Sequence, residues 1–174
     1  MKIIKLLSQL SHNKGYWLFY IAGSLGLLAM ALYSQYINEE QPCVMCIQVR
    51  LLLSLLIVVA IFGLLTRDKG LLNHLSNLSV VLVAGVLVER SYMLLGTERG
   101  FIFSDCGFDA GLPAWFQLDV WLPWLYGIET SCGYTPEIIF GVTMAESLIV
   151  ISVGLMVFSA IIFVLGMVKP GADK

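Results

Sequence analysis

Four long apolar runs determine what this chain of 174 residues can fold into. They cover residues 15–36, 44–65, 75–95 and 147–168. Each is about as long as the ~20 apolar residues that an α-helix needs to cross a bilayer. Composition agrees, because 59% of the residues are hydrophobic and 13% are charged, whereas soluble domains have about 45–50% and about 25%. We therefore predict an all-α membrane protein, a four-transmembrane-helix bundle that forms a single domain over residues 1–174.

The first run also has features of a secretory signal peptide. Ala29-Met30-Ala31 resembles the small-residue cleavage site that ends such a peptide. However, the run stays apolar beyond that site, which is typical of a membrane span. We therefore predict that residues 15–36 are a retained anchor.

The basic residues predict which side of the membrane each connection faces. Seven of the ten lysines and arginines lie at the chain ends or in the connection after the second run, namely Lys2, Lys5, Lys14, Arg67, Lys69, Lys169 and Lys174. The positive-inside rule assigns these segments to the cytoplasm. Residues 37–43 and 96–146 then face the opposite compartment, and these loops and the adjoining start of the second span carry all four cysteines, Cys43, Cys46, Cys106 and Cys132. This is the side of the membrane on which disulfides persist.

A Cys-x-x-Cys pair stands at the start of the second run. Pro42 fits the first turn of a helix, where its missing N–H costs nothing, and a helix N-terminus stabilises a thiolate at Cys43 or Cys46. Cys46 and Arg50 are four residues apart, so they lie on one helix face, about 6 Å from each other. A thiolate beside a guanidinium predicts a redox centre, in which Arg50 stabilises an anion. The alternative is that Arg50 only extends toward the membrane surface, and Arg90, next to Glu89, has the same two interpretations.

Three interpretations of the four cysteines remain open from the residues alone. A tetrathiolate zinc site usually has two Cys-x-x-Cys knuckles, but 25 residues separate Cys106 from Cys132, and we predict no metal. Two structural disulfides are possible, although a bridge between Cys43 and Cys46 closes a loop too small to stabilise the fold much. A redox relay explains both pairs at once.

A relay that ends in the membrane needs an electron acceptor there. The chain has no haem signature and no flavin motif, so we predict a lipid-soluble quinone bound near Cys46. A net charge of -2 argues against nucleic-acid binding.

The loop over residues 96–146 contains an aromatic segment at residues 112–126. Three tryptophans and interspersed polar groups suit the membrane–water boundary, and Pro113, Asp119 and Pro123 prevent a membrane span. We predict an interfacial segment; the alternative is a hydrophobic plug that packs on the ends of the spans.

These features together resemble the DsbB family of bacterial inner-membrane proteins. The resemblance covers nearly the whole chain: four spans, the Pro42-to-Cys46 motif with Arg50, the spacing of Cys106 and Cys132, and the segment Pro113-x-Trp115 to Leu118-Asp119-x-Trp121-x-Pro123. Gly141 and Met144 also recur before the fourth span.

The resemblance implies a function and a role for each cysteine. A DsbA-like periplasmic thioredoxin-fold protein would be the partner, and ubiquinone or menaquinone the electron acceptor. Cys106 would form the mixed disulfide with the partner, and Cys132, its bridge partner, would then attack Cys43. The freed Cys46 thiolate would form a charge-transfer or covalent adduct with the quinone, whose site would include Cys46, Arg50 and Met144. Both termini would be cytoplasmic and the cysteines periplasmic.

The chain departs from the family near this site. Family members commonly have Glu or Gln immediately before the arginine, where Val49 stands, with Gln48 one place earlier. After Met144 they often have Pro and then Trp two residues on, where Ala145 and Ser147 stand. These changes leave open a specialised paralogue with a dedicated DsbA-like partner. A separate alternative, from a different class of protein, is a structural membrane subunit with stapling disulfides.

Overall fold

A computed structural model describes residues 10–102, 111–113, 117–130, 137–139 and 141–168 of the chain. Four long helices make up most of this part: α2 (Lys14–Ile37), α3 (Val44–Thr66), α4 (Gly70–Glu98) and α7 (Met144–Val168). A short 3₁₀ helix, η1 (Leu10–His12), precedes α2. Each of the four long helices contains a segment long and apolar enough to cross a membrane. The predicted all-α fold with four membrane helices is confirmed.

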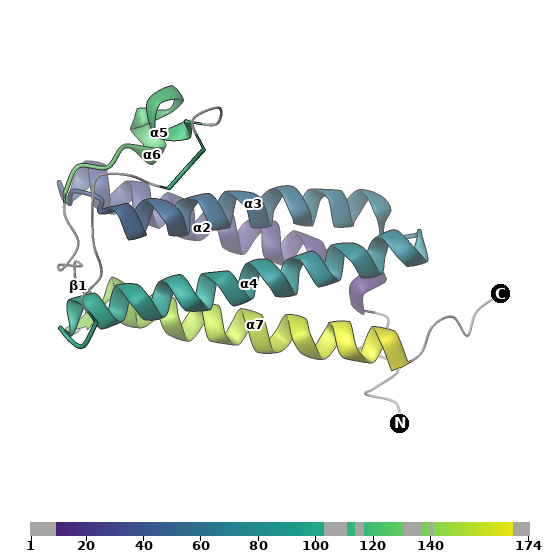
Figure 1. Ribbon diagram of the computed structural model, residues 1–174. Helices are drawn as coiled ribbons and strands as arrows, with labels where there is room; N and C mark the ends of the chain where they lie inside the picture. Colours follow the sequence, from purple (N-terminus) through teal and green to yellow (C-terminus); the bar gives the residue numbers. More distant parts are fainter. Residues whose placement is uncertain (1–9, 103–110, 114–116, 131–136, 140, 169–174) are drawn as a thin grey trace.

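The four helices pack side by side as a bundle (Figure 1). Consecutive long helices contact each other, α2 with α3, α3 with α4 and α4 with α7. Helix α7 also meets α2, because the Phe158 ring packs against the rings of Tyr16 and Phe19. The start of α2, the turn between α3 and α4 and the end of α7 lie at one end of the bundle (Figure 1). The connections from α2 to α3 and from α4 to α7 lie at the other end, called here the cysteine end because Cys43 and Cys46 are there.

Helix α4 is longer than its apolar run. It begins at Gly70, so the connection after α3 is a turn of a few residues rather than the polar segment that the sequence indicates. The difference arises because Asn73, which lies between the second and third predicted spans, is buried with a partner from η1, and Asn77, one helical turn further on, is buried with a partner from α2. Asn73 donates a hydrogen bond to the Ser11 hydroxyl at 3.2 Å, and Asn77 accepts one from the Tyr16 hydroxyl at 2.9 Å. Satisfied polar groups of this kind are compatible with a helix interface inside a membrane protein.

A tryptophan fitted against a glycine joins α2 to α3. Trp17 is fully buried, and its indole N–H donates to the Ser11 carbonyl at 2.9 Å. A Cβ atom on Gly63 would lie 2.3 Å from Cζ3 of the Trp17 ring. The absence of a side chain at Gly63 is therefore what allows the two helices to approach this closely.

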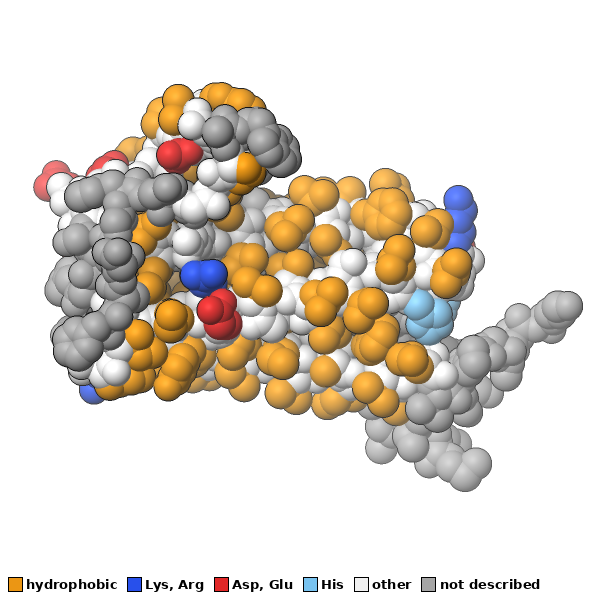
Figure 2. Space-filling view, in the orientation of Figure 1, with side chains coloured by type: hydrophobic (Ala, Val, Ile, Leu, Met, Phe, Trp, Pro, Cys, Tyr) orange, Lys and Arg blue, Asp and Glu red, His pale blue; other side chains and the backbone are white. Residues whose placement is uncertain are grey.

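The outer faces of the helices are apolar. Figure 2 shows hydrophobic side chains spread over the visible faces of α3, α4 and α7. Large aliphatic side chains on these faces are well exposed, among them Val58, Leu65, Leu82 and Val150. Contiguous exposed apolar surface of this extent is characteristic of a lipid-facing surface.

In its described residues, the connection from α4 to α7 contains α5 (Leu118–Trp121), α6 (Pro123–Tyr126), β1 (Glu137–Ile139) and β2 (Val142–Thr143). Strands β1 and β2 pair antiparallel, and the sequence patterns did not indicate this hairpin. Gly141, just before β2, has φ +77°, a left-handed conformation that glycine adopts without strain.

The predicted interfacial segment contains α5 and α6, beside α3 at the cysteine end (Figure 1). Val120, Trp121 and Trp124 are exposed, whereas Tyr126 is buried and its hydroxyl lies 2.7 Å from that of Ser54. The segment therefore docks on the bundle and also turns an apolar face outward. Its position at a membrane boundary stays a prediction.

Candidate functional site

Helix α3 begins at the Cys-x-x-Cys pair. Cys43 is the N-cap, and its Sγ accepts a hydrogen bond from the backbone N–H of Cys46 at 3.4 Å, the position in which Ser or Thr hydroxyls usually cap helices. The two Sγ atoms lie 3.0 Å apart, about 1 Å more than a disulfide bond length. Pro42 precedes the cap, so our prediction that it lies in the first helical turn is wrong. Its carbonyl is used instead by a neighbouring segment.

That neighbouring segment is residues 129–130, which precede Cys132 in the sequence. The backbone N–H groups of Glu129 and Thr130 both donate to the Pro42 carbonyl, at 3.0 and 3.4 Å. Thr130 forms a parallel β-bridge with Cys43. The segment just before Cys132 is therefore hydrogen-bonded to the segment that carries Cys43. Cys106 and Cys132 themselves lie outside the described residues.

Arg50, one turn after Cys46, is only 4% exposed. One terminal nitrogen donates to Oε1 of Gln35 at 2.7 Å and to the Leu125 carbonyl at 3.0 Å, and the other donates to the Ala31 carbonyl at 3.2 Å. Its guanidinium is therefore held between α2, α3 and α6 and does not reach the surface. Its Nε–H is buried and has no hydrogen-bond acceptor in the described part of the chain.

A cavity of about 100 Å³ lies beside this arginine. Its lining includes Cys46, Arg50 and Met144, the three residues that the sequence analysis groups as a quinone site. Apolar side chains from α2, α3, α4 and α7 complete most of the wall. Two positions that depart from the family pattern, Val49 and Ser147, also line it, whereas Ala145 is buried in the cluster around Cys43.

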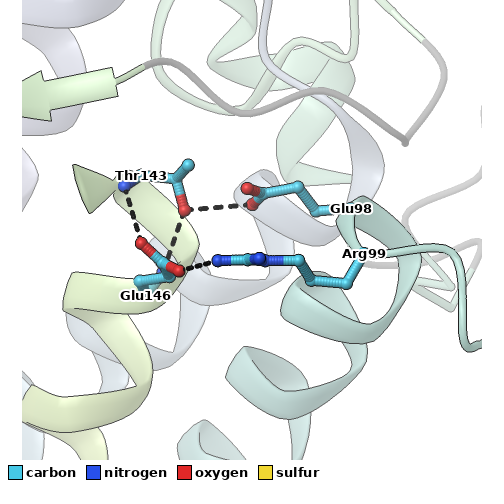
Figure 3. A network of polar contacts seen from close by, with 4 residues as sticks. All are labelled: Glu98, Arg99, Thr143 and Glu146. Atoms are coloured by element: carbon cyan, nitrogen blue, oxygen red, sulfur yellow. Dashed lines mark hydrogen bonds and ion pairs between the residues drawn. The ribbon is translucent and has the colours of Figure 1, made fainter. Parts of the chain in front are cut away.

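The start of α7, which carries Met144 to this cavity, is tied to the end of α4 (Figure 3). The Glu146 carboxylate accepts from the Thr143 backbone N–H at 3.1 Å, and the Thr143 hydroxyl accepts from the Glu146 N–H at 3.3 Å. This reciprocal pair is a capping box. Arg99 forms an ion pair with Glu146, and the Thr143 hydroxyl donates to Glu98 at 3.2 Å.

Arg90 lies elsewhere. It does not line the cavity of Cys46 and Arg50, but a second cavity of about 600 Å³ along α3 and α4. Arg90 pairs with its neighbour on α4, because its Nε lies 3.2 Å from the Glu89 carboxylate. Arg90 also donates to Gln48 at 3.2 Å, so Gln48 is directed away from the first cavity.

Sequence reasoning missed two residues at this site, Gln35 and Glu129. The available signal for Gln35 is an amide inside the first apolar run, and the structure buries it. Glu129 belongs to the α4–α7 connection, and its amide partner lies on α2. Its proximity to Arg50 follows from the docking of that connection, which no local pattern encodes.

The family match and the similar relatives of this chain point to the same family. Residues 13–162 match the family described as disulfide bond formation protein DsbB. A Disulfide bond formation protein B of Shewanella amazonensis (strain ATCC BAA-1098 / SB2B) is 31% identical over 168 residues, covering 95% of this chain and 98% of the relative. Proteins of the same name from Shewanella sp. (strain MR-4) and Yersinia pestis (strain Pestoides F) are each 28% identical, covering 96% and 97% of this chain and 95% and 96% of the relatives. The chain belongs to the DsbB family of disulfide bond formation proteins.

Proposed function

We propose that this protein is a thiol:quinone oxidoreductase of the bacterial inner membrane. It reoxidises a periplasmic DsbA-like thioredoxin-fold protein and passes the electrons through two cysteine pairs to ubiquinone or menaquinone. The observation that carries the proposal is the shared cavity, which brings a Cys-x-x-Cys sulfur and a buried cation together beside apolar, lipid-compatible walls.

The cavity residues fit a quinone. A quinone ring is flat with apolar faces, and its carbonyl oxygens accept hydrogen bonds. The buried Nε–H of Arg50 lacks an acceptor in the described part of the chain, and a buried donor without an acceptor is costly. Cys46, Arg50 and Met144 would hold the quinone. When bound, it would supply the oxidising power, taking up two electrons and two protons to become a quinol.

The remaining steps are thiol–disulfide exchanges among the chain's own sulfurs. The partner's thiolate attacks Cys106 and releases Cys132, which attacks Cys43 and releases Cys46 as a thiolate. The second partner thiol then displaces Cys106, and the partner leaves oxidised. Cys106 next attacks Cys132, which restores that disulfide and leaves Cys43 and Cys46 as the reduced pair. Each attacker must be a thiolate within reach of the next sulfur, and the bond between residues 129–130 and Pro42 supports the Cys132–Cys43 step.

The sidedness of the proposal comes from the charges. Lys14, Arg67 and Lys69 belong to the bundle end opposite the cysteine end. The positive-inside rule then gives cytoplasmic termini and periplasmic cysteines. A DsbA-like donor with a potential of about −120 mV is a strong oxidant, so its reoxidation requires an acceptor as oxidising as a membrane quinone.

A second candidate is a specialised paralogue that serves a dedicated DsbA-like partner. The observation that favours it is that Val49 and Ser147, two departures from the family pattern, line the cavity. Substrate competition between DsbA-like proteins separates the two candidates. A structural subunit with stapling disulfides is a third, and its disulfides would resist exchange with a DsbA-like dithiol.

The decisive experiment is reconstituted oxidation of a DsbA-like dithiol by the purified protein with a short-chain ubiquinone or menaquinone. We expect quinone-dependent turnover, which Cys46→Ser abolishes while the partner is still trapped at Cys106. Normal turnover in that variant would remove the role of Cys46. A wild-type protein that never reduces a quinone, or labelling of these thiols from the cytosolic face, would overturn the proposal.

A further inference from the structure

The Gln35 side chain lies between a cation and a carboxylate. Its Oε1 accepts from Arg50 at 2.7 Å, and its Nε2 donates to the Glu129 carboxylate at 3.3 Å. Gln35 and Arg50 are both more than nine-tenths buried, at 8% and 4% exposure, whereas Glu129 is at the surface. The three side chains form a short path from the surface of the cysteine end to the cavity wall.

The direction of this path is fixed by chemistry. A guanidinium can only donate hydrogen bonds and a carboxylate can only accept them. The amide between them must therefore turn its oxygen to Arg50 and its NH₂ group to Glu129. If the Glu129 carboxylate is lost, the NH₂ end of the Gln35 amide is no longer held. The Gln35 oxygen, which accepts the shortest of the three Arg50 side-chain hydrogen bonds, then becomes free to reorient.

Glu129 also contacts the chain that carries Cys43. Its backbone N–H donates to the Pro42 carbonyl at 3.0 Å, beside the bridge between Thr130 and Cys43. One residue thus bonds through its backbone to the Cys43 segment and through its side chain to the partner of Arg50. The position of the segment before Cys132 and the position of the guanidinium are linked through it.

We propose that Glu129 is a positioning residue that couples docking of the segment before Cys132 to the affinity of the Cys46–Arg50 cavity for quinone. When the segment lies on Pro42, Glu129 fixes Gln35 and Gln35 fixes Arg50. When the segment leaves, the guanidinium loses this support and the cavity binds quinone less well. This inference rests on the proposed function and adds a regulation of the same site.

Affinity for a short-chain ubiquinone, measured by quenching of tryptophan fluorescence, tests the coupling without turnover. We expect Glu129→Ala to raise the Kd about three- to tenfold, as for the loss of one hydrogen bond near a charged group. Glu129→Gln should stay within about twofold of wild type, because its amide oxygen still accepts from Gln35. Glu39→Gln is the matched control, because Glu39 is an exposed acidic residue of the same end of the bundle.

Two further measurements distinguish positioning from a general structural role. The apparent KM for quinone should rise in Glu129→Ala while the KM for the dithiol partner stays within about twofold, since one hydrogen bond near the cavity is lost. The double variant with Gln35→Ala should bind no more weakly than Gln35→Ala alone, because the two residues act in one path. The coupling would be overturned by an unchanged Kd in Glu129→Ala or by equal changes in its two KM values. It would also be overturned if the losses of quinone affinity in Glu129→Ala and Gln35→Ala add in the double variant, or if Glu129→Gln raises the Kd as much as Glu129→Ala.

The failure of the coupling is distinguishable from that of the proposed function. If wild-type protein binds a quinone but does not reduce it, the oxidoreductase proposal fails, and the Kd comparison still decides the coupling. If wild-type protein binds no quinone, both fail.

Discussion

Thr130 and Cys43 lie side by side in a parallel β-bridge that joins the two connections of the cysteine end. Two hydrogen bonds to the Pro42 carbonyl hold the bridge. Cys132 is two residues after Thr130, and two residues of chain span at most about 7 Å, so the bridge between Thr130 and Cys43 limits how far Cys132 can lie from Cys43. The contact thus relates the position of Cys43 to that of the segment leading to Cys132.

This relation predicts which sulfur Cys132 meets. With Cys46 and Cys106 replaced by Ala, the remaining Cys43 and Cys132 should form a disulfide under mild oxidant, detectable by mass spectrometry of unreduced peptides. With Cys43 and Cys106 replaced instead, the pair of Cys46 and Cys132 should form at least about tenfold more slowly, because a disulfide needs Cα atoms within about 7 Å. Equal rates would mean that the bridge does not direct the exchange.

Arg50 should control quinone binding more than partner binding. Arg50→Gln removes the charge and the fork of donors that holds Gln35 and the carbonyls of Ala31 and Leu125. We expect an increase of about tenfold or more in the apparent KM for quinone, as for the loss of a buried, hydrogen-bonded charge, with little change in the KM for the dithiol partner. Steady-state kinetics with each substrate varied in turn measures both values.

Arg90→Gln is the matched control for this experiment, since Arg90 lines a different cavity. Its quinone KM should equal that of the wild type. If the KM for quinone rises by a similar factor in Arg50→Gln and Arg90→Gln, the effect is due to loss of positive charge in general and not to the position of Arg50.

The contact of Trp17 with Gly63 should be sensitive to a single methyl group. Gly63→Ala places Cβ 2.3 Å from the buried ring, and overpacking of this kind typically costs about 1–3 kcal/mol. Thermal unfolding in detergent should therefore show a lower Tm. Gly85→Ala is the control, because its Cβ would meet nothing within 4 Å, and Ala is favoured over Gly in a helix by about 1 kcal/mol. A Tm for Gly63→Ala at or above that of the control would refute the close approach of α2 and α3.

At the start of α7, the capping box should matter more than the ion pair. Thr143→Ala removes a capping hydrogen bond and should cost about 1 kcal/mol. Glu146→Ala removes the reciprocal hydrogen bond and should also lower stability, and both variants should show faster hydrogen exchange in the first turn of α7. Arg99→Ala should cost less than about 1 kcal/mol, because the Arg99 side chain is 58% exposed and solvent screens such pairs. If Arg99→Ala proves the most destabilising of the three, the ion pair rather than the cap holds this junction.

Local patterns in the sequence predict the four long helices and the residues that share a helix face. Apolar length is sufficient to identify four spans, and the interval from Cys46 to Arg50 places both on one face of α3. Pro42 was assigned to the wrong side of the helix start, because its carbonyl is needed by Glu129 and Thr130, which lie far away in the sequence.

The remaining differences have the same physical origin, which is contact between distant segments. The sequence places Asn73 in the connection before the third span, whereas the structure includes it in α4, where Ser11 accepts its hydrogen bond. Gln35 and Glu129 join the site only when α2 and the α4–α7 connection meet at the cysteine end. Periodicity and composition describe single elements, so they contain no information about such pairings.

The capping of α3 by Cys43 has a consequence for how the helix behaves during turnover. The sulfur that accepts the Cys46 N–H is also the one that exchanges with Cys132 in the mechanism we propose. An exchange that draws this sulfur away would deprive the first turn of α3 of its cap at the stage when the proposed mechanism leaves Cys46 as a thiolate. The opening turn of the helix would then fray and refold once per catalytic cycle, in step with the oxidation state of its first sulfur.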